Sequence, residues 1–415
     1  MSRLLAVSAC ALLASLAAAG ARAQNLVISN ARVIVGPGKI VENGTVVVRD
    51  GLIASVSATA APAPKGVTAI DGTGMTVMAG FIDDHRHIVN GPADAFISSG
   101  RAAKEMLETL EAGITTVQSG GDNDAAVLAL KKAVDGGQFK GPRIITSGRV
   151  PTAGFKSEDE VRAAIRKVIA AGADSIAEVH YPILEPAINI PSEQESRNLA
   201  AAIDEAKKQH INCQVHAVSP AAMVRSAELG GVKQVHTPQF GWMTEAEAKR
   251  VKDAGAQVAS CAGFGVPVFG IYNQDNKPTF RDGKPWPSGI LNGEGQGREA
   301  GYKAVNARTL YDAGVVFGFC TDTQFAAPAA MAHELRALSL TFSPIDLIPV
   351  LGPNSAAFID KTDRGTLEPG KLADMVVLAG NPLEGYWNLL NPKIVIKGGV
   401  IEVDKRPAPA AKARR

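Results

Sequence analysis

Hydrophobic positions follow two different patterns along the 415-residue chain. Toward both ends, short β-branched stretches alternate with turn signals such as "ENG" and "RDG", which is typical of antiparallel strands. These stretches are residues 26–35, 45–49, 52–57, 373–380 and 393–403. We expect the two ends, 24–78 and 365–405, to pair into one small β domain.

The central region, residues 79–364, instead alternates short apolar runs with helical patterns. The runs are 77–83, 114–120, 142–148, 175–181, 211–217, 233–237, 257–262 and 315–322. Segments 157–172, 192–210 and 244–255 have the helical period, and Ser157 with Glu160 predicts a capping box. Alternating β and α units with continuously apolar strands predict an α/β fold with a parallel sheet. Eight such units predict a (β/α)8 TIM barrel. An open doubly wound sheet is the alternative, but no Gly-rich nucleotide turn follows the first run.

The first 23 residues have the pattern of a signal peptide. Arg3 precedes an apolar run, and "ARA" at 21–23 ends in small residues at the spacing of a cleavage site. An uncleaved membrane anchor is the alternative, but the polar residues Gln24 and Asn25 favour cleavage. We therefore expect an exported protein, periplasmic or secreted, without a stable membrane anchor. A disordered basic tail is expected at 406–415.

Composition narrows the range of partners. The chain has 43 Lys and Arg against 41 Asp and Glu, so charge gives no reason to expect nucleic acid or an anionic membrane as a partner. A homo-oligomer is left open. Cys10 falls within the predicted signal, and Cys213, Cys261 and Cys320 are far apart and odd in number. We interpret these three as buried free thiols, although export would permit disulfides.

Most of the histidines stand where central apolar runs end. His85 and His87 follow the first run, His180, His216 and His236 mark the ends of the fourth, fifth and sixth, and Asp322 ends the eighth. In a barrel, the carboxyl ends of the strands surround one opening. His85 and His87 are two residues apart on a strand, so their side chains lie on the same face. Imidazoles together with a carboxylate are typical zinc ligands, and other divalent metals are the alternative. The pattern predicts a metal site, and the neighbouring Asp84 is expected to be a solvated acid.

Several of these motifs resemble the amidohydrolase superfamily, in particular its imidazolonepropionase-like and Xaa-Pro dipeptidase-like branches. The similar stretches are "GMTVMAGFIDDHRH" at 74–87, "QVHA" at 214–217, "QVHT" at 234–237, "GFCTD" at 318–322 and "GTLEPGKLADMVVLAGNPL" at 365–383. The resemblance implies a distorted barrel with a β-sandwich made from both termini. It also implies that His85, His87 and Asp322 bind one metal ion and that His216 and His236 bind a second. In single-metal members, the strand-five histidine joins the first site and the strand-six histidine contacts substrate.

The chain departs from this family at its fourth run, within "GADSIAEVH" at 172–180. Two-metal members of these branches carry a lysine there that becomes carboxylated and bridges the metals, and Ala177 stands in its place. Glu178 is the neighbouring candidate, since some superfamily members bridge with a glutamate. Strand alternation turns Glu178 away from the direction of the lysine unless a bulge re-aims it. Pairing of Glu178 with a base in the helix layer is the alternative, so one or two metals per chain are open.

The expected chemistry is hydrolysis by a metal-activated hydroxide. A metal ion lowers the pKa of bound water from about 15.7 towards about 7 and polarises a carbonyl group. Asp322 is the candidate general base that passes a proton to the leaving amine, and His236 is a candidate for stabilising the oxyanion. These roles predict an exported metal-dependent amidohydrolase that cleaves an amide or peptide C–N bond. The alternatives are a mononuclear hydrolase or deaminase of cyclic amides, hydrolysis of a lactone, carbamate or phosphotriester, and a non-catalytic binding protein.

Candidates for contacts with a small amide or peptide substrate come from two places. Segment 263–300 is long and rich in Gly, Pro and aromatic residues, and loops of this length are usually functional or disordered. We expect it to cover the substrate, with Phe264 and Tyr272 in contact; a solvated insertion or an oligomer contact is the alternative. His180 and Tyr181 are further candidates beside the fourth run, with packing as the alternative for Tyr181.

Overall fold

The computed structural model describes most of the chain between residues 25 and 407. The described ranges are 25–59, 64–89, 92–150, 155–181, 191–263, 295–322, 326–390 and 392–407. The predicted signal at 1–23, the residues Phe264 and Tyr272, and most of the predicted tail lie outside these ranges. Among the described helices, none is long and apolar enough to cross a membrane.

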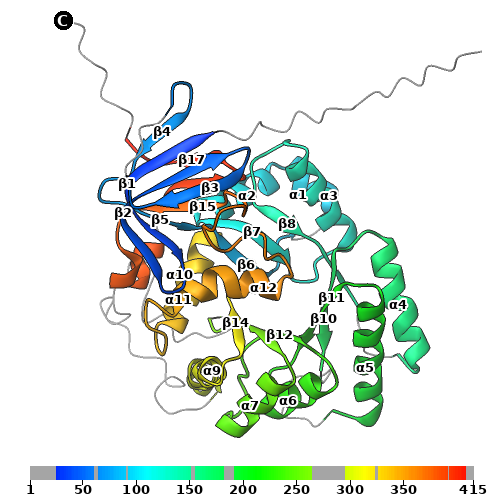
Figure 1. Ribbon diagram of the computed structural model, residues 1–415. Helices are drawn as coiled ribbons and strands as arrows, with labels where there is room; N and C mark the ends of the chain where they lie inside the picture. Colours follow the sequence, from blue (N-terminus) through cyan, green and yellow to red (C-terminus); the bar gives the residue numbers. More distant parts are fainter. Residues whose placement is uncertain are drawn as a thin grey trace, which may run out of the picture.

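Strands from the two ends of the chain share one sheet (Figure 1). Its strands are β1 (Leu26–Gly36), β2 (Lys39–Arg49), β3 (Leu52–Ser57), β4 (Thr68–Asp71), β5 (Thr76–Ala79), β15 (Met375–Leu378), β16 (Pro392–Lys397) and β17 (Val400–Asp404). The N-terminal and C-terminal strands meet where β15 pairs antiparallel with β5. Side chains on one face of this sheet form an apolar cluster of their own, while Met78, Val376 and Val395 on the other face join the cluster of the helices and parallel strands, because alternate side chains of a strand lie on opposite faces.

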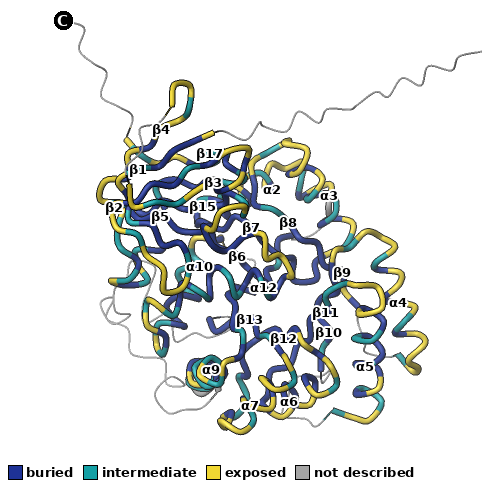
Figure 2. Tube along the Cα trace, viewed as in Figure 1, coloured by how far each residue is buried: buried dark blue, intermediate teal, exposed yellow. Residues whose placement is uncertain are grey.

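Two further sheets are parallel throughout. One has the order β6 (Phe81–Arg86), β7 (Ile114–Ser119) and β8 (Arg143–Ile145). The strands of the other are β9 (Ser147–Arg149), β10 (Ser175–His180), β11 (Asn212–His216), β12 (Lys233–Val235), β13 (Gln257–Ala259) and β14 (Val316–Gly318), each paired with the next. Nearly all of their residues are buried (Figure 2), as expected for parallel strands whose faces are both covered.

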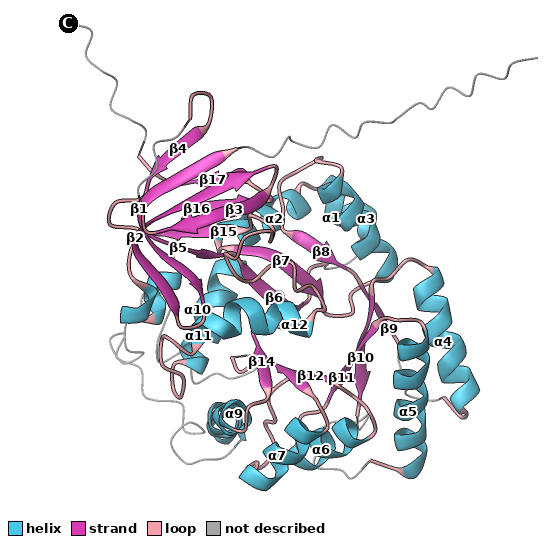
Figure 3. Cartoon of the chain, in the orientation of Figure 1, coloured by secondary structure: helices cyan, strands magenta, loops and turns pink. Residues whose placement is uncertain are grey.

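Helices follow most of the parallel strands and lie around them (Figure 3). They are α1 (Ala93–Ser98), α2 (Arg101–Glu111), α3 (Asp124–Asp135), α4 (Glu158–Ala170), α5 (Glu193–Lys208), α6 (Pro220–Glu228), α7 (Glu245–Asp253), α9 (Gly295–Asp312), α10 (Ala327–Leu338), α11 (Leu347–Pro349) and α12 (Ser355–Phe358). Ser157 caps α4 by accepting from the Glu160 amide. The Glu160 carboxylate accepts from the Lys156 amide, one residue earlier than the capping box predicted. Complete capping boxes begin α5 at Ser192 and α7 at Thr244.

Several of the predicted runs differ in extent from the strands. The first run, 77–83, is divided at Gly80 between β5 and β6, which belong to different sheets. A side chain at Gly80 would lie 2.4 Å from atoms of Thr115, so only glycine permits this close crossing of β7. The third run is divided into β8 and β9. In the eighth run, the strand ends at Gly318, four residues before Asp322.

Candidate metal centre

Five histidines and two carboxylates come together beyond the ends of the parallel strands. His85 lies near the end of β6 and His87 just after it, while His180 and His216 are the last residues of β10 and β11. His236 follows β12, and Asp322 follows β14 by four residues. Their side-chain ligand atoms form overlapping groups within 4.8 Å, among them His85–His87–Glu178 and Glu178–His216–His236. Side chains far apart in sequence thus surround one centre, and Glu178 belongs to both of these groups.

The β6–β14 group consists of His85, His87 and Asp322. Oδ1 of Asp322 lies 3.3 Å from Nε2 of His85 and 3.3 Å from Nε2 of His87. Burial alone would raise the pKa of Asp322, but His236, His85 and His87 outweigh it and lower the pKa. Asp322 is therefore held as a carboxylate, with its oxygen directed between two imidazoles.

Each histidine of the β6–β14 group has its other ring nitrogen in contact with a side chain from a distant part of the sequence. Nδ1 of His85 lies 2.9 Å from Oε1 of Gln214 on β11, and Nδ1 of His87 lies 3.2 Å from Oδ1 of Asp122, which follows β7. Burial lowers the pKa of His87, but the contacts with Asp122 and Asp322 outweigh it and raise the pKa to about 10. Partners of this kind fix the tautomer and direction of metal-binding imidazoles.

Our sequence reasoning did not identify Gln214 or Asp122, although the pattern contains a signal for each. Gln214 stands two residues before His216 on the same strand, so alternation directs both to one face. Asp122 is an acid just beyond the second apolar run, and the predicted ligands stand at the ends of such runs. The Oδ2 atom of Asp122 also accepts from the Ile88 amide at 2.8 Å, which holds the chain just past His87.

The β10–β12 group consists of Glu178, His216 and His236. Oε1 of Glu178 lies 2.7 Å from Nδ1 of His216 and 3.3 Å from Nε2 of His236. The same oxygen lies 3.8 Å from Nε2 of His85, so it faces both groups. Burial would raise the pKa of Glu178, but contacts with His180, His216 and His236 hold the pKa well below its usual range.

The direction of Glu178 follows from an irregularity in β10. Where β10 pairs with β11, Ile176 is opposite Cys213 and Val179 is opposite Val215, so β10 has one more residue than its partner over this stretch. An extra residue of this kind reverses the alternation beyond it. Glu178 consequently turns toward the histidines and not toward a base in the helix layer, while Ala177 is buried and offers no ligand.

His180 lies at the edge of the β10–β12 group. Its ring stacks on His216 with centroids 4.2 Å apart and planes 6° from parallel, and its Nε2 atom lies 3.7 Å from Oε2 of Glu178. His236 is more enclosed, and burial together with His216 lowers its pKa to about 4. At neutral pH the His236 ring is therefore uncharged, which is the form that binds metals.

Two other acids near the centre are buried. Asp84, expected to be solvated, is fully buried, and burial raises its pKa well above the usual range. This correction follows from the position of Asp84 inside β6, where its amide donates to the Phe319 carbonyl at 2.8 Å. Glu334 on α10 accepts from the amides of Ala262 and Gly263 at 2.8 and 2.5 Å. Burial raises the pKa of Glu334 to about 7.

Two of the sequence-based interpretations need correction here. Cys261 and Cys320 are not free thiols: they form a disulfide with Cα atoms 5.0 Å apart, because they follow β13 and β14, which are neighbours in the sheet. Cys213 is free and buried as expected. The hydroxyl of Tyr181 lies 2.8 Å from Oγ of Ser196 on α5, so it points into the helix layer and packs there instead of facing the substrate.

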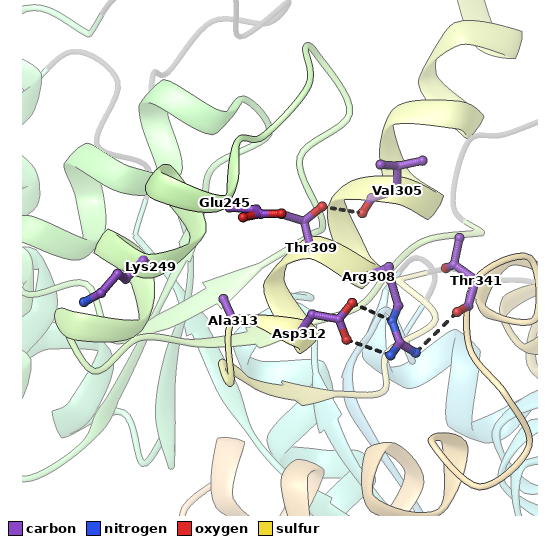
Figure 4. A pocket seen from close by; sticks show the side chains of 8 residues that line it. All are labelled: Glu245, Lys249, Val305, Arg308, Thr309, Asp312, Ala313 and Thr341. Carbon is purple, nitrogen blue, oxygen red and sulfur yellow. Dashed lines mark hydrogen bonds and ion pairs between the residues drawn. The ribbon is translucent and has the colours of Figure 1, made fainter.

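A separate pocket of ≈ 700 Å³ lies between α7 and α9 (Figure 4). Its lining includes none of the clustered histidines; it consists of Glu245, Lys249, Val305, Arg308, Thr309, Asp312, Ala313 and Thr341. Figure 4 shows Arg308 directed at the Asp312 carboxylate and the Thr341 carbonyl. Arg308 and Asp312 pair within the wall of this pocket, while Lys249 pairs with Asp253 outside it.

Comparison with known proteins gives consistent matches over most of the chain. The model of the amidohydrolase family matches residues 76–272 and 280–402. Imidazolonepropionase of Salinispora arenicola (strain CNS-205) is 24% identical over 392 residues, covering 85% of this chain and 89% of that protein. A putative prolidase from Bifidobacterium longum has a TM-score of 0.72 at 23% identity, covering 93% of this chain and 97% of the other. A Xaa-Pro dipeptidase with bound methionine has a TM-score of 0.74 at 21% identity, covering 91% and 99%. The resemblance inferred from the sequence motifs is confirmed.

Proposed function

We propose that this chain is an exported, metal-dependent hydrolase of amide or peptide bonds. It belongs to the amidohydrolase family of hydrolases that act on carbon–nitrogen bonds. The observation that carries the proposal is the position of Glu178. Its side chain shares one ligand group with His85 and His87 and another with His216 and His236. A carboxylate placed between two sets of imidazoles takes the place of the lysine that this chain lacks.

The donor set fits divalent cations, and we propose zinc, one ion in each group. The buried side-chain atoms without a hydrogen-bond partner among the described residues include Nε2 of His85, Nε2 of His180 and Oδ1 of Asp322. Buried polar atoms are rarely left unsatisfied unless an ion or ligand binds them. His85, His87 and Asp322 would hold one ion, and His216 and His236 the other, with Glu178 between them. A divalent cation supplies positive charge that polarises a carbonyl group and acidifies water.

Asp322 is the proposed general base. Its carboxylate takes a proton from the attacking water and delivers it to the leaving nitrogen. The neighbouring imidazoles that lower its pKa keep it unprotonated at neutral pH, and its amide donates to the His85 carbonyl at 2.9 Å, which fixes its place beside the histidines. His236 serves as a ligand in the two-metal form. In a one-metal form it is free to stabilise the oxyanion of the substrate.

We further propose that the parallel strands close into one distorted (β/α)8 barrel. Bonds from the Asp84 amide to the Phe319 carbonyl and from the Asp322 amide to the His85 carbonyl link β6 to the segment after β14. An apolar cluster that includes Ile82, Val235 and Phe358 lies among these strands, as the interior of a barrel requires. The sheet formed by both termini is then the composite β-sandwich beside it.

The proposed substrate class is supported by the likeness to a Xaa-Pro dipeptidase and a putative prolidase, and by the position of Glu178 in two ligand groups. We propose small peptides and N-acyl amino acids first. A second candidate is a cyclic amide handled with one ion, because the chain also resembles imidazolonepropionase. The metal content of the protein separates the two.

A substrate screen tests the proposed reaction. The purified protein is stripped with a chelator, reloaded with zinc, and assayed on Xaa-Pro and other dipeptides, N-acyl amino acids and cyclic amides by mass spectrometry of the products. We expect new amine and carboxylate products that vanish with chelation and return with zinc. Product formation that survives metal removal would contradict the proposal.

Export is tested independently of catalysis. The signal pattern predicts cleavage after Ala23, so mass spectrometry of the protein recovered from the extracytoplasmic fraction should show Gln24 as the first residue. Recovery of the chain with residues 1–23 still attached, or only from the cytoplasm, would contradict the proposed localisation.

A further inference from the structure

The disulfide between Cys261 and Cys320 lies directly against the candidate metal centre. Cys261 follows β13 by two residues, and Cys320 stands two residues before Asp322. Both cysteines are fully buried, in an apolar cluster with Val235 and Ala259. A disulfide at this position joins two neighbouring strand ends that also carry residues of the centre.

The sulfur of Cys261 lies among the ligands of the centre. Its Sγ atom, a ring nitrogen of His236 and a carboxylate oxygen of Asp322 all lie within 4.8 Å of one another, and all three residues are buried. Nδ1 of His236 is 3.6 Å from Oδ2 of Asp322. One thiolate, one imidazole and one carboxylate are a donor set that zinc accepts readily.

The backbone holds these three residues in an unusual conformation. The φ angles are 76° for His236, 43° for Cys261 and 45° for Asp322, in the left-handed region that non-glycine residues seldom adopt. The three residues follow β12, β13 and β14, which are consecutive strands. Conformations of this kind concentrate at functional sites, where the surrounding structure enforces them. A left-handed φ thus recurs just after three neighbouring strands, at the three residues whose ligand atoms lie together.

We propose that Cys261, His236 and Asp322 form a further, redox-gated metal site that opens when the Cys261–Cys320 disulfide is reduced. In the oxidised protein, the Cys261 sulfur is bonded to Cys320 and is not available as a thiolate ligand. A dithiol reductant breaks the S–S bond, becomes a disulfide itself, and leaves a thiol on each cysteine. A zinc-class ion then displaces the proton of the Cys261 thiol and binds the sulfur.

This inference rests on the metal centre of the proposed function, since the two sites share His236 and Asp322. The expected consequence is competition. An ion held by the Cys261 sulfur draws Asp322 and His236 away from the roles proposed for them in hydrolysis. The oxidised form is thus the hydrolytic form, which agrees with the oxidising compartments in which exported proteins are found.

A pair of variants separates sulfur ligation from loss of the disulfide. Cys320→Ser and Cys261→Ser both remove the S–S bond, but only Cys320→Ser leaves a thiol beside His236 and Asp322. Each variant and the wild type, before and after dithiol reduction, are loaded with Co²⁺. Bound cobalt is measured by elemental analysis, and thiolate ligation by the near-ultraviolet charge-transfer absorption between sulfur and cobalt. Cys10 and Cys213 are the same in every sample.

We expect the sulfur–cobalt absorption in Cys320→Ser and in the reduced wild type, and not in Cys261→Ser or the oxidised wild type. If Cys320→Ser does not fold by circular dichroism, the reduced wild type provides the same comparison. Bound cobalt without this absorption in the reduced wild type and Cys320→Ser would overturn the redox-gated site and leave the proposed hydrolytic centre intact. The absorption in Cys320→Ser together with no bound cobalt in the oxidised wild type would support the redox-gated site and contradict the proposed centre.

Discussion

The β6–β14 group and the β10–β12 group are held in place in different ways. In the β6–β14 group, His85 and His87 are each fixed through Nδ1 by a side chain from another strand, Gln214 or Asp122. In the β10–β12 group, one partner of His216 is Glu178, which is itself a candidate ligand. The histidines of the β6–β14 group are therefore oriented by residues outside the centre. In the other group, the described contacts include a carboxylate that an irregular strand turns inward.

The largest effect is expected from Asp322→Asn, because Asp322 faces both groups and is the proposed base. Turnover should fall by about 10²–10⁴-fold or more. Asparagine keeps the shape of the side chain and tolerates the left-handed φ of 45° at this position. Circular dichroism and thermal melting should therefore match the wild type. Unchanged turnover in this variant would remove Asp322 from the role of base.

The stability of the protein should depend on pH through Glu334, which accepts hydrogen bonds from the stretch after β13. The folded-state pKa of Glu334 is about 7, above the usual glutamate value of 4.5, so its contribution to stability is complete below the unfolded pKa and is lost as pH rises through about 7. The difference of about 2.5 units corresponds to on the order of 3 kcal/mol. Glu334→Gln should lack this loss, so the stability of the wild type relative to the variant should fall between pH 4.5 and 7.

Denaturant unfolding of the metal-free protein across this pH range measures the effect. Glu205→Gln is the matched control, because the pKa of Glu205 is lowered and its removal should not reproduce the pattern. A pH profile of Glu334→Gln that runs parallel to the wild type would show that the raised pKa of Glu334 is incorrect.

A smaller effect is expected from Asp122→Asn, which weakens the external support of the β6–β14 group. Loss of a carboxylate that orients a metal-binding histidine typically reduces metal affinity by about 10–100-fold. Asp124→Asn is the control, since Asp124 lies two residues away and bonds to the Arg149 amide. Competition titration with a zinc chelator should show weaker binding only for Asp122→Asn. Equal affinities in the two variants would mean that Asp122 does not support His87.

The sequence predicted the candidate ligands because hydrophobic runs end where those residues stand. His85, His87, His216, His236 and Asp322 all lie at or just beyond such ends. The direction of Glu178 was left open because it depends on one extra residue in the pairing of β10 with β11, and strand alternation within β10 contains no information about its partner. The disulfide was missed for a different reason. Cys261 and Cys320 are 59 residues apart and become neighbours only when consecutive strands are placed side by side.

The contrast between the two groups leads to one direct measurement: the zinc content of the wild type and of Glu178→Gln, purified without added metal or chelator and determined by elemental analysis. If Glu178 bridges two ions, the wild type should contain close to two zinc ions per chain. Glu178→Gln should retain close to one zinc ion per chain, held by the β6–β14 group. A wild type with one ion, or a variant that keeps two, would contradict the bridging role of Glu178.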